Sequence, residues 1–455
     1  MKTKTTLLTA IAMMGMALFS CSTEDEDKPI LIIDPVMGPT SPEEADSTAW
    51  ATDSTDVPTD SAWTYEYRPA KAISLTTEQQ ALCQQLTTFS WQLLDQLYRQ
   101  SPTQNILFSP FSIETELGMI INGMQGEGKN ELKALLCLNA YEGISDEALN
   151  TFFATMATGI EEADNMTRFT SSNAVWHRKD WALNPNFQNA LQQDYGVEIF
   201  PITFTEQTAN DINQWCAEKT HGRIPNLVPK TTSLDVMHLV NAVYFRSNWK
   251  NFFHEESTSK ASFTTDNGEQ QTVDMMRNGY LEREFRYAST DTYQLANLPF
   301  NNGAYSMMFI LPNETSNIAD AIGSIATQGI QYQHPGGRLL HLSLPKFKAT
   351  AAYLLKDVLT NMGCTLFQSS NESFCLFQNP AYNFAPSGML HKAFLQIDEA
   401  GAEAAAATDT WWDGDSGEEH TYTTIELTFD RPFLYAIIEQ STGYPLFLGY
   451  LGHVE

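Results

Sequence analysis

The sequence has few basic residues and no long apolar run. Its 26 Lys and Arg stand against 55 Asp and Glu, which gives a formal net charge of -29. Because nucleic-acid binding requires a basic face that neutralises phosphates, this balance excludes nucleic acid as a partner. The apolar stretch from Leu7 to Phe19 is shorter than the roughly 20 residues of a transmembrane helix, and no later segment supplies one.

The sequence also lacks the usual signatures of a catalytic or metal site. It contains no G-x-S-x-G elbow and no H-E-x-x-H motif, and its nine His have no metal-ligand spacing. A hydrolase triad could be formed by Ser112, His391 and an Asp, but no oxyanion-hole signature accompanies them. An enzyme is therefore a weaker hypothesis than the inhibitor and the binding protein considered below. We expect no metal and no cofactor. The later cysteines have no paired spacing and are expected to be mostly buried thiols; they are Cys83, Cys137, Cys216, Cys364 and Cys375.

The first residues read as an export signal. Lys2 and Lys4 precede the apolar stretch, which ends in Leu18-Phe19-Ser20-Cys21. This ending resembles the lipobox of bacterial lipoproteins, and the resemblance implies that residues 1–20 are removed and Cys21 is acylated. The alternative is an ordinary signal peptide with an incidental Cys.

An acidic run follows Cys21, with Glu24, Asp25, Glu26 and Asp27. It resembles the export tags that send lipoproteins of some Gram-negative bacteria to the outer face. We therefore expect an exported lipoprotein, anchored in the outer membrane and exposed at the surface. The lipid on Cys21 would be its only link to a membrane.

The remaining chain divides into two parts. Residues 21–72 are rich in Asp, Glu, Pro, Ser and Thr, a composition that predicts a disordered acidic tether. Residues 73–455 have no linker-like break and are predicted to form one α+β domain. A helix is expected after the capping residue Thr76, and strands are expected later in the chain; these strands are 236–245, 305–311, 339–347, 425–429 and 434–438.

Three ordered groups of motifs resemble the serpin family across nearly all of residues 75–455. The first group is Asn105-Ile106-Leu107-Phe108-Ser109-Pro110-Phe111-Ser112-Ile113, and the second is Asn241-Ala242-Val243-Tyr244-Phe245 followed by Trp249-Lys250. The third comprises His391-Lys392-Ala393-Phe394, Glu399, Gly401, Glu403 to Thr408, Phe429-Asp430-Arg431-Pro432-Phe433 and Leu446-Phe447-Leu448-Gly449. A single motif of this kind would be weak, but the ordered set is specific.

The resemblance implies helices packed on three β-sheets, with an exposed reactive-centre loop at about residues 399–428. A target serine or cysteine protease would cut this loop, and its N-terminal side would insert into the main sheet and trap the protease. The chain would then be an inhibitor and not an enzyme, and we expect it to act as a monomer.

The loop sequence suits insertion as a strand. The hinge that the resemblance assigns consists of Glu399, Gly401, Ala402, Glu403, Ala404, Ala405, Ala406, Ala407 and Thr408. From Glu403 to Asp415 every charged side chain falls at an odd position, so all would point to one face of a strand. Glu418 breaks this alternation, which predicts that insertion stops near residues 414–417.

The cut is predicted at Asp415-Ser416. This bond lies at the family's usual distance from Gly401, where the charge alternation also ends. Counting back from Pro432 instead points near Thr421, so the loop is several residues longer than is usual. Neighbouring bonds, at Trp412, Gly414 and Tyr422, are alternative cut sites.

The resemblance assigns structural roles to further residues. Ser109, Ser112, Asn241 and His391 match a polar cluster beneath the main sheet, the shutter, which must rearrange when the sheet opens. Trp249 matches the breach, where the loop first enters, and Lys346 with Glu399 matches an ion pair at the base of the loop.

The runner-up hypothesis is a non-inhibitory serpin-fold surface protein that binds or carries another molecule, with a loop that is only a substrate. Non-inhibitory relatives tend to carry bulky, charged or proline residues in the hinge. The small residues from Gly401 to Ala407 therefore favour inhibition.

Overall fold

The computed structural model describes most of the chain after the predicted tether. The described residues are 67–138, 144–251, 253–278, 281–282, 285–330, 332–333, 338–364, 366–367, 373–380, 384, 386–402 and 423–455. Cys21, the hinge from Glu403 to Thr408 and the bond Asp415-Ser416 lie outside them.

The first described helix is the one that the sequence predicts. Helix α1 (Thr77–Gln100) begins with a capping box, in which Thr76 Oγ1 accepts from the Gln79 backbone N–H and Gln79 Oε1 accepts from the Thr76 N–H. Its apolar stripe is buried because it recurs at helical spacing. The other α-helices are α2 (Pro110–Asn122), α3 (Gly126–Leu135), α4 (Asp146–Ala163), α5 (Pro185–Asp194), α6 (Thr208–Lys219), α7 (Ile318–Gln328) and α8 (Lys356–Asn361), and η4 (Glu255–Ser257) is a 3-10 turn.

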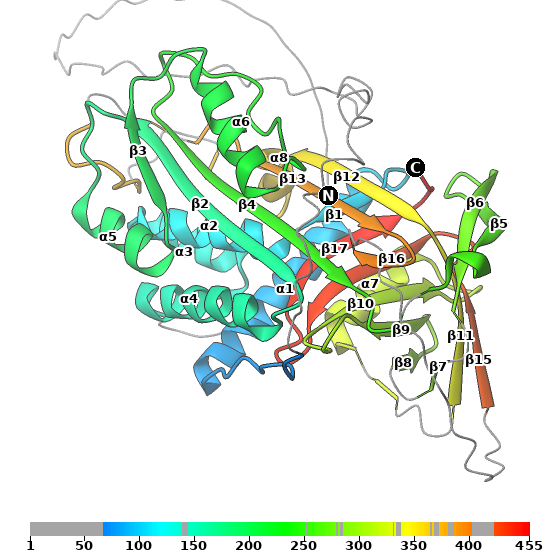
Figure 1. Cartoon of the computed structure of the whole chain (residues 1–455). Coiled ribbons are helices and arrows are strands. Elements are labelled where there is room, and N and C mark those ends of the chain that lie inside the picture. The colour runs from blue at the N-terminus through cyan, green and yellow to red at the C-terminus, as the bar shows by residue number, and fades with distance from the viewer. Residues whose placement is uncertain are drawn as a thin grey trace, which may run out of the picture.

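The main sheet has six strands and lies across the molecule (Figure 1). In order they are β12 (Phe347–Leu354), β13 (Leu390–Ile397), β14 (Gly401–Ala402), β4 (Met237–Asn248), β2 (Arg168–Arg178) and β3 (Glu198–Ile202). All pairs are antiparallel except β2 with β3. The strand β14, which contains only two residues, therefore lies between two much longer neighbours.

Two further sheets complete the fold. The second contains β1 (Ile106–Phe108), β17 (Pro445–Leu451), β16 (Phe433–Glu439), β10 (Tyr305–Pro312), β9 (Tyr293–Pro299) and β8 (Arg286–Ser289). The third contains β15 (Thr423–Thr428), β11 (Arg338–Pro345), β6 (Gln270–Arg277) and β5 (Ser259–Thr264), with β7 (Leu281–Glu282) beside β11. The predicted α+β class, helices with three sheets, is confirmed.

One predicted strand is in fact two. The apolar run 339–347 is interrupted at Lys346, where the chain leaves β11 in the third sheet and enters β12 in the main sheet. Periodicity alone cannot detect such a passage, because both strands keep their apolar side chains toward the interior. The other predicted strands are confirmed, with small shifts of their ends.

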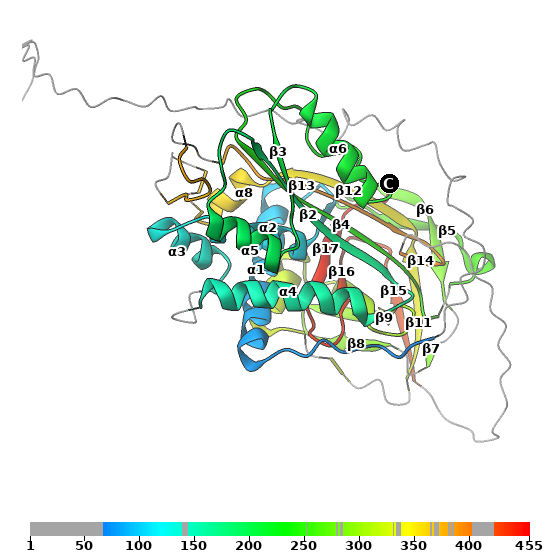
Figure 2. The same ribbon diagram turned by 60° about the vertical axis from the view of Figure 1, so that its left-hand side comes forward.

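Helices cover both faces of the main sheet. Figures 1 and 2 show α6 on one face and helices α1 and α2 on the other. Beneath α6 lies a separate apolar cluster, in which Ile212 and Trp215 pack with Trp176 and Val240 of the sheet. The five described cysteines are free thiols, and Cys83, Cys216 and Cys364 are buried.

The described residues show neither a membrane span nor a metal site. None of the described helices is long and apolar enough to cross a bilayer. The same residues contain no group of three or more His, Cys, Asp and Glu side chains that could hold a metal ion.

Candidate functional site

The site centres on β14, at its position between β13 and β4. Ala402 lies opposite Ile397 on one side and opposite Ser247 on the other, and Gly401 lies opposite Asn248. Ala402 is completely buried. The hinge thus begins as a strand that is already paired on both edges.

A tight turn brings the chain from β13 back into β14. One carboxylate oxygen of Asp398 accepts from the backbone N–H groups of Ala400 (3.0 Å) and Gly401 (3.3 Å). Gly401 has φ +150°, and a Cβ there would lie 2.7 Å from the Asn248 Cα and overlap the Ser247 carbonyl. Only glycine meets both conditions without strain.

Trp249, which the resemblance assigns to the breach, forms hydrogen bonds with this turn. Its indole Nε1–H donates to the Asp398 carbonyl at 2.9 Å, and its backbone N–H donates to the Ala400 carbonyl at 2.9 Å. The indole stacks on Phe300 with ring centroids 4.6 Å apart. Trp249 is 2% exposed, so a large buried ring fixes the point where the loop meets the sheet.

The predicted ion pair at the base of the loop is present. Lys346 Nζ lies 2.8 Å from Glu399 Oε2, and Thr258 Oγ1 donates to Glu399 Oε1 at 2.7 Å. Burial acts to raise the pKa of Glu399, but the bonds from Lys346 and Thr258 outweigh it, and the net shift is downward. Thr258, which precedes a strand of another sheet, was not predicted from the sequence.

Three of the four predicted shutter residues lie together. The Ser109 backbone N–H donates to His391 Nε2 at 3.0 Å, and Ser109 Oγ caps helix α2 by accepting from the Ser112 N–H at 3.3 Å. Burial lowers the pKa of His391 to about 3, so its ring is neutral. Ser112 and His391 are 3% and 6% exposed. Because both side chains are buried, a substrate cannot reach them as a nucleophile and a general base.

Asn241, the fourth predicted residue, has different partners. Its Nδ2 donates to Asn173 Oδ1 at 2.6 Å and to Ser171 Oγ at 3.2 Å, both on β2. Its buried Oδ1 has no hydrogen-bond partner among the described residues. Ser171 and Asn173 belong to the site but were not predicted, although polar residues at alternate positions of a buried strand could have drawn attention to them.

Asn241 and His391 lie level with each other on the facing edges of β4 and β13. Asn241 is six residues from Ser247, and His391 is six residues from Ile397, the two residues that flank Ala402. Both side chains are on the inner face of the sheet, because they share the alternation of Phe245 and Leu395, which belong to the main core. A strand that extended β14 would thus meet both polar side chains at one position.

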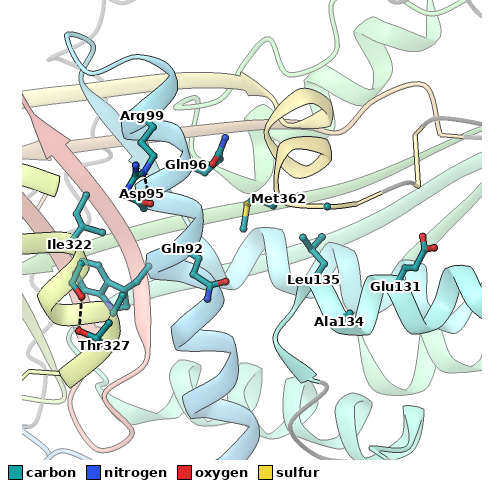
Figure 3. A pocket seen from close by; sticks show the side chains of 14 residues that line it. Gln92, Asp95, Gln96, Arg99, Glu131, Ala134, Leu135, Ile322, Thr327 and Met362 are labelled. Atoms are coloured by element: carbon teal, nitrogen blue, oxygen red, sulfur yellow. Dashed lines mark hydrogen bonds and ion pairs between the residues drawn. The ribbon is translucent and has the colours of Figure 1, made fainter. Parts of the chain in front are cut away.

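A cavity elsewhere in the fold is unconnected with this site. It has a volume of about 490 Å³ and lies between α1, α3 and α7 (Figure 3). Asp95 and Arg99, which line it, pair with each other at 2.7 Å. None of the predicted site residues lines it.

The comparisons with known proteins agree with this geometry. The family model described as "Serpin (serine protease inhibitor)" matches residues 84–453. The chain belongs to the serpin family. Among similar proteins, leukocyte elastase inhibitor A of Mus musculus is 28% identical over 382 residues, which cover 80% of this serpin and 97% of that protein.

Solved serpin structures have the same fold. The thermophilic serpin tengpin in its native state superposes with a TM-score of 0.73 at 25% identity, covering 86% of this chain and 98% of that one. Human thyroxine-binding globulin complexed with thyroxine has a TM-score of 0.69 at 22% identity, covering 83% and 100%, which shows a common fold alone. Protease inhibitors are therefore among the homologous proteins.

Proposed function

We propose that this serpin is an irreversible suicide-substrate inhibitor of serine and/or cysteine endopeptidases. The protease cuts its loop at Asp415-Ser416. The loop then inserts into the main sheet between β13 and β4 as a continuation of β14, and the protease remains covalently trapped.

The observation that carries this proposal is the position of β14 between β13 and β4. In the described part of the chain, only Gly401 and Ala402 lie between β13 and β4, although the facing strands continue toward His391 and Asn241. Backbone groups along those edges gain partners when a strand enters. Completing the sheet therefore supplies a driving force for insertion.

The chain sequence fits the space that such a strand would fill. In the register of β14, Thr408 comes level with both Asn241 and His391, and its hydroxyl could donate to the unpartnered Asn241 Oδ1. Ala404 and Ala406 would face the core, where small side chains enter without overpacking. The acidic residues at odd positions would face outward.

The chemistry of trapping requires nothing catalytic from the serpin. The protease nucleophile attacks the carbonyl carbon of Asp415, the C–N bond to Ser416 breaks, and the Ser416 amine takes up a proton as a new N-terminus. Insertion carries the acyl-enzyme away before water hydrolyses the ester or thioester. A carboxylate before the cut suits a protease with a cationic pocket, such as an Asp-directed enzyme.

The proposal includes the location of the inhibitor. The N-terminal signal and Cys21 support an exported lipoprotein anchored in the outer membrane and facing outward. There it would protect a bacterium from proteases in its surroundings.

The second candidate is a non-inhibitory binding protein on the same fold. The similar fold of thyroxine-binding globulin, whose structure was solved with thyroxine, supports this alternative. The cavity between α1, α3 and α7 would be its natural site, since 490 Å³ falls within the range of small-molecule pockets. The small residues of the hinge favour inhibition.

The deciding experiment mixes the mature chain with a panel of serine and cysteine proteases, including Asp-directed ones. We expect an adduct that survives SDS and, after denaturation, a C-terminal peptide that begins at Ser416. Cleavage by every protease without an adduct would reject inhibition in favour of the binding protein.

A hinge variant provides the matched control. Ala402→Arg would place a long cation in a fully buried position and should block insertion while leaving the scissile bond unchanged. We expect this variant to be cut without forming an adduct. An adduct as abundant as that of the unmodified chain would show that trapping does not depend on β14.

A further inference from the structure

Two arginines lie directly opposite each other in the main sheet, where β2 begins and β4 ends. Arg168 on β2 pairs with Arg246 on β4 in the antiparallel ladder. Both point to the outer face, because they share the alternation of Trp176 and Val240, which pack beneath α6. Like charges opposite each other destabilise a sheet unless an anion compensates them.

No described carboxylate compensates this pair. Neither Arg168 nor Arg246 forms a salt bridge with an Asp or Glu of the described residues, although the chain as a whole carries 55 acidic residues. We name Arg168, Arg246 and His221 the arginine patch. The His221 ring contacts Tyr244 at 4.8 Å between centroids, and burial together with Arg168, Arg246 and Arg223 lowers its pKa.

The N-terminal end of the described chain lies at the same end of the main sheet as this patch. The Arg68 carbonyl accepts from Asn302 Nδ2 at 3.2 Å, and the Lys71 N–H donates to the Ala163 carbonyl at 3.0 Å. The sequence placed both residues in the tether, yet both bond to the body of the protein. Ile73 then packs on Gly159, so the segment follows the end of α4.

A short polar chain links Arg68 to the arginine patch. Asn301, the neighbour of Asn302, donates from Nδ2 to Ser247 Oγ at 3.0 Å and to Thr167 Oγ1 at 3.2 Å. Thr167 and Ser247 are the sequence neighbours of Arg168 and Arg246. The N-terminal segment therefore leaves the body at the same end of β2 and β4 as two cations that have no acidic partner among the described residues.

The segment that precedes Arg68 has the complementary charge. Residues 22–66 contain twelve Asp and Glu and one Lys, and the acidic residues closest to the body are Asp56, Asp60 and Glu66. An extended chain spans at most about 3.6 Å per residue, so Asp60 could reach as far as roughly 29 Å from Arg68. Attachment to the same chain also gives these carboxylates a high effective concentration.

We propose that the acidic N-terminal segment docks on the arginine patch through Asp56, Asp60 and Glu66. The docked segment lies on the outer face of the sheet, at the end of β2 and β4 where Arg168 pairs with Arg246. The docking itself does not depend on protease inhibition.

Chemical modification of arginine tests the docking directly. The chain from Ser22 onward is treated with phenylglyoxal, and the modification rate of each arginine is measured by mass spectrometry. At low salt we expect Arg168 to react several-fold more slowly than in the triple variant Asp56→Asn, Asp60→Asn, Glu66→Gln. Near 1 M salt, where the Debye length is about 3 Å, the difference should vanish.

Two controls sharpen the test. Neutralising three distant acids with Glu24→Gln, Asp25→Asn and Asp27→Asn removes the same charge and should leave Arg168 protected. Arg178, at the other end of β2, should react equally in all variants.

Three outcomes would overturn the docking. The first is equal reactivity of Arg168 in the unmodified chain and the first triple variant. This result would show that the segment does not cover the patch, which would then be a site for an external acidic partner. The second is protection that increases with protein concentration, which would assign the patch to a second copy. The third is equal loss of protection in both triple variants, which would indicate only a general effect of net charge. Because no protease is used, these results are independent of whether the chain inhibits.

Discussion

The backbone N–H of Ser109 donates to His391 Nε2 at 3.0 Å, which connects the first residue of the α2 cap to a strand of the main sheet. The acceptor nitrogen must be unprotonated. Opening the sheet along β13 therefore requires either that this bond is broken or that α2 moves with the strand.

The buried His391 should make the fold sensitive to acid. Its folded pKa of about 3 lies below the ordinary value of about 6.5. The stability that it contributes is complete above pH 6.5 and is lost as the pH falls toward 3. Between pH 7.5 and 4.5 we expect the unmodified protein to lose about 2–3 kcal/mol relative to His391→Gln.

Urea unfolding of both proteins at the two pH values measures this difference. A constant difference in free energy of unfolding between the two proteins would contradict a neutral, buried His391.

Glu114 should give the opposite dependence. It is fully buried on α2, where Tyr444 OH donates to one oxygen, and its second oxygen lies 2.7 Å from Ser90 Oγ. Ser90 Oγ also donates to the Leu86 carbonyl at 2.9 Å and has a single proton, so a protonated Glu114 can donate to Ser90. Burial raises the pKa of Glu114 to about 8, although the bonds from Tyr444 and Ser90 oppose this rise.

This contribution to stability is complete below about pH 4.5 and is lost as the pH rises through 8. From pH 5 to pH 8 the unmodified protein should therefore lose on the order of 3 kcal/mol relative to Glu114→Gln. Parallel free energies of unfolding for the two proteins across this range would show that Glu114 is ionised in the fold.

The ion pair of Lys346 with Glu399 should respond unequally to the loss of each partner. Lys346→Met leaves a nearly buried carboxylate with Thr258 alone, and we expect a loss of about 1–2 kcal/mol. Glu399→Gln keeps an acceptor for Thr258 and frees a lysine that water already reaches, so its cost should be below about 1 kcal/mol. Equal losses on thermal or urea unfolding would contradict this asymmetry.

Gly401 should tolerate no side chain. Gly401→Ala would strain a φ of +150° and drive a Cβ into the Ser247 carbonyl, so β14 would have to leave its seat. We expect a loss of about 2–4 kcal/mol in unfolding free energy and faster hydrogen exchange of the Ala402 amide. Gly323→Ala, at a helical site with open space around it, is the matched control and should be neutral or slightly stabilising.

The sequence predicted the elements better than their pairing. Thr76 and the apolar spacing after it located α1, because capping and periodicity are local properties. The passage at Lys346 from one sheet to another was not predicted, since both strands bury apolar residues. Likewise, a motif match grouped Asn241 with His391, whereas the structure places them on the facing edges of β4 and β13, with none of the described strands between them at that level. Contacts between such edges depend on how the strands pair, which neither residue specifies.

The position of the C-terminal hairpin determines whether the two fragments of a cleaved molecule stay associated. Strands β16 and β17 follow the loop in the chain, yet they lie inside the second sheet, paired with β10 and β1, and all their residues are buried. A cut between residues 403 and 422 would therefore produce two polypeptides that remain one particle. Size-exclusion chromatography of the cleaved protein should show an unchanged elution volume, and the small fragment should separate only in denaturant.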